Sequence, residues 1–379
     1  MDKVYSDSLK LHKKFHGKLE IKSKVPIRNK KYLSLAYTPG VAEVCRIIAK
    51  DKNLTREYTL KRNTVAVVTD GSAILGLGNL GPEAAIPVME GKAILFKEFA
   101  NIDAFPICLD TQDTEEIIKT IKHLAPVFGG INLEDISAPR CFEIEARLKK
   151  ELSIPVMHDD QHGTATVVLA AMINALKLKK IDKSAAKVVI SGAGAAGTAV
   201  AKMLVKYGFK NVSVCDSKGL LYEKRGDLSG SKLALAVLTD PQVSADTSLK
   251  GVLKKADIFV GISGPNIIGR AEVKSMNAKP VILALANPVP EIMPKEAKAG
   301  GAFIVASGRS DFPNQINNVL AFPGIFRGLL DNQVTQITDE MLIKAAESLA
   351  GYVKKLSPDS ILPNPLDKGI VKVIARAIK

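Results

Sequence analysis

The sequence predicts an α/β protein built of two units, an N-terminal α/β domain followed by a Rossmann-type domain with a doubly wound parallel sheet. Short apolar runs alternate with helical stretches in both halves of the 379-residue chain. That length is expected for two domains, each with its own core. A glycine-rich turn at residues 192–197 directly follows one apolar run. We therefore expect domains at residues 1–160 and 161–379.

The first unit is expected to alternate strands and helices. Residues 1–25 are rich in lysine and place apolar residues at helical spacing, which predicts a surface helix. Buried strands are expected at 64–69, 105–109, 127–133 and 154–157, with helices at 114–124 and 138–151. The long apolar run 164–178 predicts a core helix. It is too short to span a bilayer.

The second unit repeats this alternation. Residues 187–191 form its first expected strand, and the helix after it is expected at 196–207. Further strands are expected at 211–215, 257–261, 281–286 and 303–306. The C-terminal stretches 339–356 and 368–379 have the spacing of amphipathic helices.

The composition argues against several classes of protein. No apolar run reaches transmembrane length, and the first residues lack the apolar core of a signal peptide. The 4 cysteines form no Cys-x-x-Cys pair, so neither a zinc site nor a disulfide framework is expected. These features favour a cytoplasmic protein without a membrane partner. The net charge of +14 is spread along the chain, which favours a solvated lysine-rich surface over a nucleic-acid-binding face.

The glycine-rich turn matches the dinucleotide-binding pattern G-x-G-x-x-G. The pattern alone is weak, but here it follows a predicted strand and opens a predicted helix. The first glycine permits the tight turn, the second lets the backbone approach a pyrophosphate, and the third allows close helix packing. The helix N-terminus adds amide donors. The expected cofactor-binding residues of this turn are Gly192, Gly194, Ala195, Ala196, Gly197 and Thr198.

An acidic residue ends the strand after this turn. Asp216 stands where a carboxylate accepts hydrogen bonds from the adenosine ribose, which favours NAD over NADP. The alternative is that Asp216 caps a turn, and the choice between NAD and NADP then stays open. A second glycine match, residues 76–81, does not directly follow a strand and runs into Pro82. We interpret it as a close-packed loop or substrate-site backbone.

Three carboxylates follow two of the predicted strands. Glu134 and Asp135 end one strand, and Asp160 follows the next. Adjacent residues on a regular strand face opposite ways, so the chain must turn for Glu134 and Asp135 to converge. Functional sites collect at strand ends of α/β sheets, and ligands that are all oxygen favour Mg²⁺ or Mn²⁺ over zinc. Each acid taken alone is more commonly a helix cap or a solvated loop residue.

The segment around Asp160 also imitates a zinc-protease motif. His158 and His162 have its spacing, but that motif requires both histidines on one face of a helix. Here a helix is expected to begin only near Thr164, after Gly163. We therefore reject the zinc interpretation and expect the two histidines to support the structure.

Several segments together resemble the malic enzymes, particularly the short bacterial and archaeal form. The resemblance covers nearly the whole chain and implies a catalytic N-terminal domain and an NAD(P)-binding C-terminal domain. It rests on residues 36–41 (AYTPGV), 68–71 (VTDG), 74–81 (ILGLGNLG), 91–93 (GKA), 133–135 (LED), 158–164 (HDDQHGT), 192–197 (GAGAAG), 287–288 (NP) and 314–319 (NQINNV).

The resemblance implies roles for individual residues. Tyr37 matches the family's proton donor and Lys92 its general base, whose pKa must be lowered by burial or neighbouring cations. Without the family, both are ordinary amphipathic surface side chains. The implied metal ligands are Glu134, Asp135 and Asp160, with Asp160 chosen over Asp159 on the family match. The implied substrate or cofactor contacts are Lys92, Asn287, Asn317 and Asn318.

The implied function is metal-dependent oxidative decarboxylation of L-malate to pyruvate and CO₂, with reduction of NAD or NADP. Oxaloacetate decarboxylation is the implied partial reaction, Mg²⁺ or Mn²⁺ the implied metal, and a homodimer the implied assembly. Ala73 departs from larger malic enzymes, which carry a carboxylate-binding arginine there, so other groups must hold that carboxylate. A malolactic-type enzyme and a non-catalytic nucleotide-sensing protein remain as alternatives.

Overall fold

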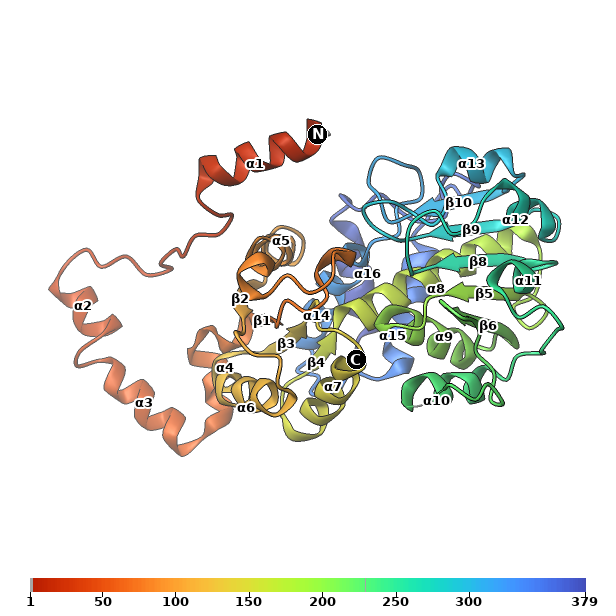
Figure 1. The fold of residues 1–379 in the computed structure, drawn as a ribbon. Helices are drawn as coiled ribbons and strands as arrows, with labels where there is room; N and C mark the ends of the chain where they lie inside the picture. Colours follow the sequence, from red (N-terminus) through yellow and green to blue (C-terminus); the bar gives the residue numbers. More distant parts are fainter. Residues whose placement is uncertain (1–2, 229) are drawn as a thin grey trace.

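The first sheet confirms the expected parallel arrangement of the N-terminal unit. The computed structural model describes residues 3–228 and 230–379 (Figure 1). Its first sheet has the strand order β2-β1-β3-β4, and all neighbouring strands are parallel. The strands are β1 (Thr64–Thr69), β2 (Asp103–Cys108), β3 (Gly130–Leu133) and β4 (Val156–His158). All residues of β1, β3 and β4 are buried, as expected for a parallel sheet covered on both faces.

Helices cover both faces of this sheet. Alternate residues of β1 face opposite sides, so Val65 and Val67 belong to the core under α5, whereas Ala66 and Val68 belong to the core under α6 and α7. These helices are α5 (Pro82–Ala100), α6 (Thr114–Leu124) and α7 (Arg140–Glu151). The prediction for residues 114–124 is confirmed, and Asp113 explains the start because its side chain accepts from the backbone N–H of Glu116.

The second sheet has the order β10-β9-β8-β5-β6-β7. All neighbours are parallel except β6 and β7. The strand order reverses between β5 and β8, and such a switch point opens a crevice at the carboxyl ends of the strands. The strands are β5 (Lys187–Ser191), β6 (Asn211–Asp216), β7 (Gly219–Leu220), β8 (Ile258–Gly261), β9 (Val281–Ala284) and β10 (Ile304–Ser307).

One long helix connects the two units. Helix α8 (Asp159–Lys179) begins five residues earlier than the expected start near Thr164. Gly163 does not delay the helix, because it is a close-packing residue within it. Among the residues that the structure describes, no helix combines the length and apolar character needed to cross a membrane. The remaining helices of the second unit are α9 (Ala195–Tyr207), α10 (Gly230–Thr239), α11 (Leu249–Leu253), α12 (Arg270–Ser275) and α13 (Pro294–Ala299).

The C-terminal helices return to the first unit. Phe322 and Phe326 of α14 pack edge-on against Phe96 of α5, with ring centroids 4.7 and 5.2 Å apart. A common core therefore joins α5, α8 and α14. The C-terminal helices are α14 (Phe322–Asp331), α15 (Asp339–Gly351) and α16 (Gly369–Ala377). Short 3-10 helices occur at η1 (Lys52–Leu54), η2 (Leu60–Asn63), η3 (Ile74–Gly76), η4 (Ala125–Val127) and η5 (Asn318–Leu320).

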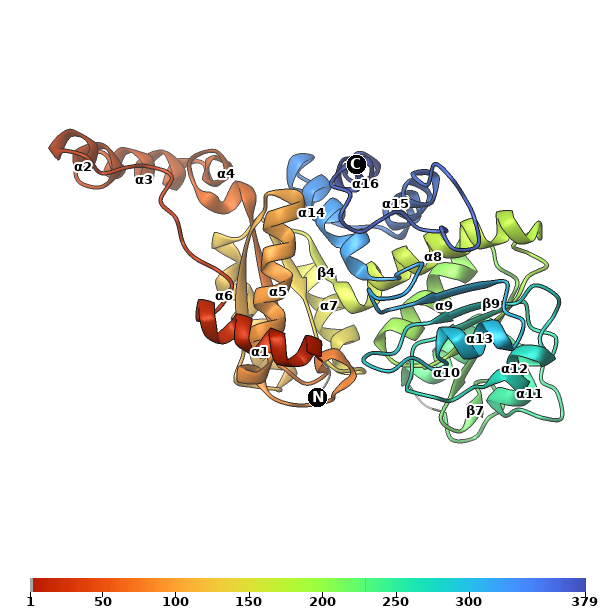
Figure 2. The ribbon, with the colours of Figure 1, turned by 90° about the horizontal axis from the view of Figure 1, so that it is seen from above.

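The N-terminal segment extends away from both sheets (Figures 1 and 2). None of residues 3–63 is buried. A surface helix was expected within residues 1–25, and the observed helix ends at Phe15. It ends there because His16 and Gly17 adopt left-handed backbone, with φ of 53° and 109°. Residues 1 and 2 of the expected range lie outside the described residues. The segment contains α1 (Lys3–Phe15), α2 (Lys30–Ala36), α3 (Val41–Lys50) and α4 (Thr55–Tyr58).

Candidate active site

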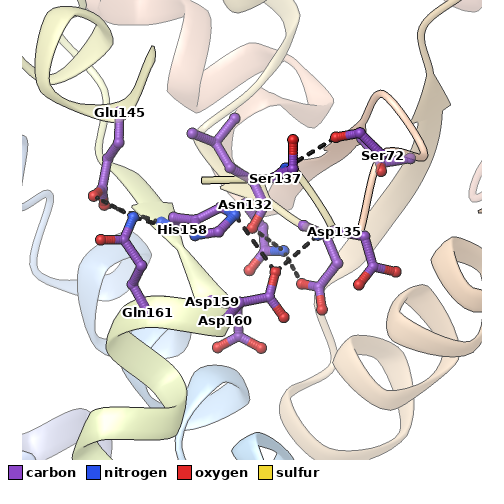
Figure 3. Close-up of polar contacts among 12 residues, drawn as sticks. Ser72, Asn132, Asp135, Ser137, Glu145, His158, Asp159, Asp160 and Gln161 are labelled. Atoms are coloured by element: carbon purple, nitrogen blue, oxygen red, sulfur yellow. Dashed lines mark hydrogen bonds and ion pairs between the residues drawn. The ribbon is translucent and has the colours of Figure 1, made fainter. Parts of the chain in front are cut away.

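Three acidic side chains converge where β3 and β4 end. Glu134 and Asp135 follow β3, and Asp160 lies in the first turn of α8. Asp135 has a left-handed φ of 52°, and this reversal lets two adjacent residues point to the same place. Candidate ligand oxygens of Glu134, Asp135 and Asp160 all lie within 4.8 Å of one another. The backbone N–H of Asp135 donates to Asp160 Oδ2 at 2.8 Å (Figure 3).

The donor set fits a hard divalent cation. Glu134 and Asp135 are each 4% exposed. Burial raises the pKa of Glu134, Asp135 and Asp160, and repulsion from Asp160 raises that of Asp135 further. Asp135 Oδ2 is buried without a hydrogen-bond partner. Carboxylates in this arrangement repel one another unless a cation neutralises them, and Mg²⁺ or Mn²⁺ matches their all-oxygen chemistry.

Lys92 lies directly beside the carboxylates. Its Nζ is 2.6 Å from Asp159 Oδ2 and 2.9 Å from Glu134 Oε1, and the side chain is 7% exposed. It also lies 4.3 Å from the ring centroid of Phe322. Lys92 is therefore a buried site residue and not a surface lysine. Sequence reasoning did not give Asp159 a role, although it stands next to Asp160 and opens the same helix.

The carboxylates around Lys92 shift its pKa in the opposite direction from the lowering that the family role implies. Burial alone would lower the pKa of Lys92, but the negative charges of Asp159 and Glu134 outweigh it and raise the pKa above its usual range. The sequence could not show that two carboxylates lie directly against Lys92. A cation held by Glu134 would offset part of this negative charge and favour the neutral amine.

Tyr37 is separated from Lys92 within one chain. It is the residue at which α2 ends, and it is 67% exposed. Both views place α2 on the extended N-terminal segment, away from α5 and the strand ends (Figures 1 and 2). The structure therefore brings together Lys92, Glu134, Asp135 and Asp160, but not Tyr37.

A buried carboxylate holds the start of α8 in place. Glu145 of α7 accepts from the backbone N–H of His158 at 3.0 Å and from Lys149 Nζ at 3.0 Å, and it lies 2.9 Å from His162 Nε2. Burial opposes the charge of Glu145, but His162 and Lys149 lower its pKa below the usual range. The backbone of His158 and the side chain of His162 thus both bond to a structural acid, in line with their expected supporting role. Figure 3 shows Glu145 beside His158 and Gln161.

The glycine-rich turn has the three features that dinucleotide binding requires. Gly192 has a φ of 119°, and a Cβ there would lie 2.4 Å from Ile262 O. A Cβ at Gly197 would lie 1.9 Å from Gly192 O, so α9 packs closely on the turn. Gly194 has no atom within 4 Å of a Cβ position, which leaves its backbone open to a ligand.

This turn lines a cleft large enough for a dinucleotide. The cleft has a volume of ≈ 940 Å³ and extends from Gly192 and Gly194 to Asp216. Ala138 and Pro139, in the loop after β3, also line it. The same loop carries Glu134 and Asp135, so the carboxylate cluster lies next to the segment that lines the cleft.

Asp216 ends β6 as expected, but its carboxylate is already engaged. Arg225 donates to both oxygens, at 2.9 and 2.7 Å, and Lys232 Nζ donates to Oδ2 at 2.7 Å. Burial opposes its charge, but Arg225 and Lys232 lower the pKa of Asp216 below the usual range. The backbone N–H of Lys218 donates to Asp216 as well, at 2.9 Å. Asp216 thus both caps a turn and faces the cleft.

The predicted asparagines occupy different surroundings. Asn317 caps η5, because its Oδ1 accepts from the backbone N–H of Val319 at 2.9 Å. Asn318 lies over the first turn of α8, with its Cβ 3.2 Å from a Cβ position at Gly163. Asn287 is exposed, and its carbonyl oxygen lies 2.9 Å from a Cβ position at Gly76. The second glycine-rich segment therefore meets the loop after β9.

Known proteins match this chain over almost its full length. The family models for "Malic enzyme, N-terminal domain" and "Malic enzyme, NAD binding domain" match residues 16–149 and 161–376. The bifunctional malic/malolactic enzyme of Bacillus subtilis is 56% identical, over 98% of this chain and 91% of its own length. The NAD-dependent malic enzyme of Geobacillus stearothermophilus is 51% identical, over 96% and 76%.

Solved structures agree with the sequence relatives. The NAD-dependent malic enzyme of Thermotoga maritima superposes with a TM-score of 0.95 at 50% identity, over 98% of this chain and 99% of that one. The malic enzyme of Entamoeba histolytica gives a TM-score of 0.95 at 37% identity, over 99% and 80%. With its two sheets, its buried carboxylates and its glycine-rich cleft, the chain belongs to the malic enzyme family.

Proposed function

We propose that this chain converts L-malate and NAD to pyruvate, CO₂ and NADH with the help of Mg²⁺ or Mn²⁺, and that it acts as a homodimer. The observation that carries the proposal is the contact of Lys92 with an acidic set fitted to a hard cation. Two of these acids lie in the loop after β3, whose Ala138 and Pro139 line the dinucleotide cleft. The relatives named as malic enzymes support it. Simple hydride transfer from an alcohol requires no hard metal, whereas loss of CO₂ from a β-keto acid benefits from one.

The chain's own residues prepare two binding sites. Glu134, Asp135 and Asp160 would hold the cation, and the amides at the start of α9 would face the pyrophosphate of the dinucleotide. When bound, the dinucleotide supplies a hydride acceptor, and the cation supplies Lewis-acid polarisation of the substrate oxygens. Asn318, which lies beside Gly163 of α8, would contact the substrate and help to replace the arginine that larger malic enzymes carry at the position of Ala73.

The side chains of the protein must also transfer protons to and from the substrate. Malate dianion and NAD⁺ become pyruvate, CO₂ and NADH without net release of a proton. The proton that leaves the C2 hydroxyl is therefore balanced by one that arrives at C3. Lys92 takes the first and Tyr37 gives the second, and a proton passes from Lys92 back to Tyr37 to complete the cycle. Glu134 links the two parts of the site, because it contacts Lys92 and belongs to the cation-binding set.

A steady-state assay tests the proposed function. Malate, NAD and Mn²⁺ should give NADH absorbance with stoichiometric pyruvate, and excess EDTA should abolish the signal until Mn²⁺ is restored. NADP should serve less well than NAD. Lactate without accumulated NADH would instead show malolactic activity, which the name of the Bacillus subtilis relative includes. Dinucleotide binding without turnover of malate would favour a nucleotide-sensing protein.

Replacing Asp216 should change the cofactor preference. In Asp216→Ser, Arg225 and Lys232 lose their carboxylate partner and become free to bind the 2′-phosphate of NADP. We expect the ratio of kcat/KM for NADP to that for NAD to rise about 30-fold, because hydrogen bonds to a charged group contribute about 2 kcal/mol. Initial rates with both cofactors measure this ratio.

A matched variant tests whether the loss of any carboxylate partner of Arg225 is enough to change the cofactor preference. Asp227→Ser also removes a carboxylate that pairs with Arg225, at 2.7 Å, but leaves Asp216 in place. It should shift the ratio much less than Asp216→Ser. Equal ratios in wild type and Asp216→Ser would show that Asp216 does not select the cofactor.

A further inference from the structure

We propose that Glu291 is a positioning residue for hydride transfer, because its carboxylate joins the loop that lines the dinucleotide cleft to the loop that carries Asn287. These are the loop after β8 (residues 262–269) and the loop after β9 (residues 285–293). Glu291 is 0% exposed, and the proposed reaction gives its carboxylate no chemical role. The inference rests on the proposed function, because it concerns how malate and the dinucleotide are aligned in that reaction.

Each oxygen of the Glu291 carboxylate accepts one backbone hydrogen bond. Oε1 accepts from the N–H of Ser263 at 2.8 Å, and Oε2 accepts from the N–H of Ala286 at 3.0 Å. Burial raises the pKa of Glu291, and these two N–H donors oppose the rise. Hydrogen bonds to a charged acceptor are stronger than those between neutral groups. One buried side chain therefore fixes the loop after β8 relative to the loop after β9.

The end of β8 leaves room for this carboxylate and for nothing else. A Cβ at Gly261, the last residue of β8, would lie 2.5 Å from Glu291 Cδ. The next residue lies against the dinucleotide turn, because a Cβ at Gly192 would lie 2.4 Å from Ile262 O. A shift of the Glu291 carboxylate would therefore be passed through the loop after β8 to the dinucleotide turn.

The loop after β8 forms part of the dinucleotide cleft. Ser263 and Gly264 line the cleft, and Ser263 Oγ lies 3.1 Å from Ser191 Oγ at the end of β5. Strands β6 and β8 lie on opposite sides of β5 (Figure 1). A dinucleotide whose adenosine binds near Asp216 of β6 would therefore extend across β5, with its nicotinamide toward β8 and β9. Glu291 supports that side of the cleft.

The loop after β9 reaches the unit that carries the carboxylate cluster. Residues 287–289 are exposed, whereas Glu291 and both of its neighbours in the sequence are buried. The carbonyl oxygen of Asn287 lies 2.9 Å from a Cβ position at Gly76, in the glycine-rich segment of the first unit. The Glu291 carboxylate thus anchors a loop whose exposed tip contacts the first unit. Loss of this anchor would shift the nicotinamide side of the site relative to the malate side.

Hydride transfer is sensitive to a shift of this kind. The reacting atoms must approach to about 3–3.5 Å, and a misplacement of about 1 Å can lower a rate about 10²-fold. Decarboxylation of added oxaloacetate transfers no hydride. A residue that aligns the nicotinamide therefore affects malate oxidation selectively, whereas a loss of folded protein lowers both reactions in the same proportion.

Glu291→Gln tests the alignment. The amide keeps the shape of the side chain but has one oxygen, so one of the two loop N–H groups loses its acceptor. We expect kcat/KM for malate oxidation to fall about 30-fold. Oxaloacetate decarboxylation, measured at saturating oxaloacetate and Mn²⁺, should stay near the wild-type rate. With L-malate deuterated at C2, the isotope effect on kcat/KM should increase, because slower hydride transfer then limits the reaction.

A second variant displaces the same carboxylate without removing it. In Gly261→Ala the new methyl group would meet the side chain of Glu291, which must move away. We expect the isotope effect to increase here as well. If Glu291→Gln does not fold, Gly261→Ala decides the question alone. Inactive protein does not contribute to the measured rate, so incomplete folding leaves the isotope effect unchanged.

Asp257→Asn serves as the matched control. Asp257 is also a buried carboxylate that accepts a backbone hydrogen bond, from the N–H of Lys187 at 3.0 Å. It directly precedes β8, at the end of the strand remote from Gly261 and the cleft. Its loss should lower the melting temperature and leave the isotope effect at the wild-type value.

Three results would overturn the inference. They are a wild-type isotope effect in the folded variants Glu291→Gln and Gly261→Ala, a parallel loss of malate oxidation and oxaloacetate decarboxylation, and an equal rise of the isotope effect in Asp257→Asn. Failure of the wild type to oxidise malate would instead overturn the proposed function.

Discussion

Asp160→Asn is expected to lower Mn²⁺-dependent malate oxidation about 10³-fold, because loss of one ligand carboxylate removes several kcal/mol of Lewis-acid stabilisation. The asparagine Oδ1 can still accept from the Asp135 backbone N–H, which Asp160 Oδ2 accepts at 2.8 Å in the wild type. The contact between the loop after β3 and the start of α8 should therefore persist. Initial rates across a Mn²⁺ titration measure the effect, and NAD binding by fluorescence should be nearly unchanged.

The same variant has a thermal signature that does not depend on turnover. In EDTA, Asp160→Asn should melt at a higher temperature than wild type, because it removes the half-buried carboxylate that repels the buried Asp135. In Mn²⁺ the order should reverse, because only the intact set gains stability from the bound cation. Wild-type activity in Asp160→Asn, or equal stabilisation of both proteins by Mn²⁺, would remove Asp160 from the metal site.

Most of the fold could be predicted because its elements have sharp local signals. Strands β1 and β5 match the predicted ranges 64–69 and 187–191, since both are short runs of β-branched residues. The start of α8 could not be predicted in this way. Gly163 suggested a break, but a Cβ there would lie 1.9 Å from Asp159 Oδ1, so this glycine serves close packing inside the helix.

The residues of the candidate site could likewise be predicted only where local sequence determines their position. Glu134, Asp135 and Asp160 could be selected because strand ends of a parallel sheet meet at one edge. The left-handed φ of Asp135 and the contact of Asp159 with Lys92 depend on tertiary packing, which local sequence does not encode. The exposure of Tyr37 also depends on tertiary structure, because it follows from the path of α2 away from both sheets.

Lys92→Ala is expected to lower kcat for malate oxidation by about 10³-fold, within the usual range for loss of a general base. The effect should depend on which reaction is followed. Decarboxylation of added oxaloacetate removes no hydroxyl proton, so the variant should retain far more of that partial reaction than of malate oxidation. Measurement of NADH formation from malate and of pyruvate formation from oxaloacetate, in one buffer with Mn²⁺, gives the comparison.

Lys92 also neutralises Asp159 and Glu134, so a purely structural loss must be separated from a catalytic one. Lys92→Arg keeps a cation near both carboxylates but cannot act as a base near neutral pH, because the guanidinium stays protonated. If Lys92 only balances charge, the arginine variant should recover malate oxidation; if it moves the proton, arginine should restore thermal stability and leave oxidation low. Equal losses of both partial reactions in Lys92→Ala, with recovery of both in Lys92→Arg, would exclude Lys92 as the base.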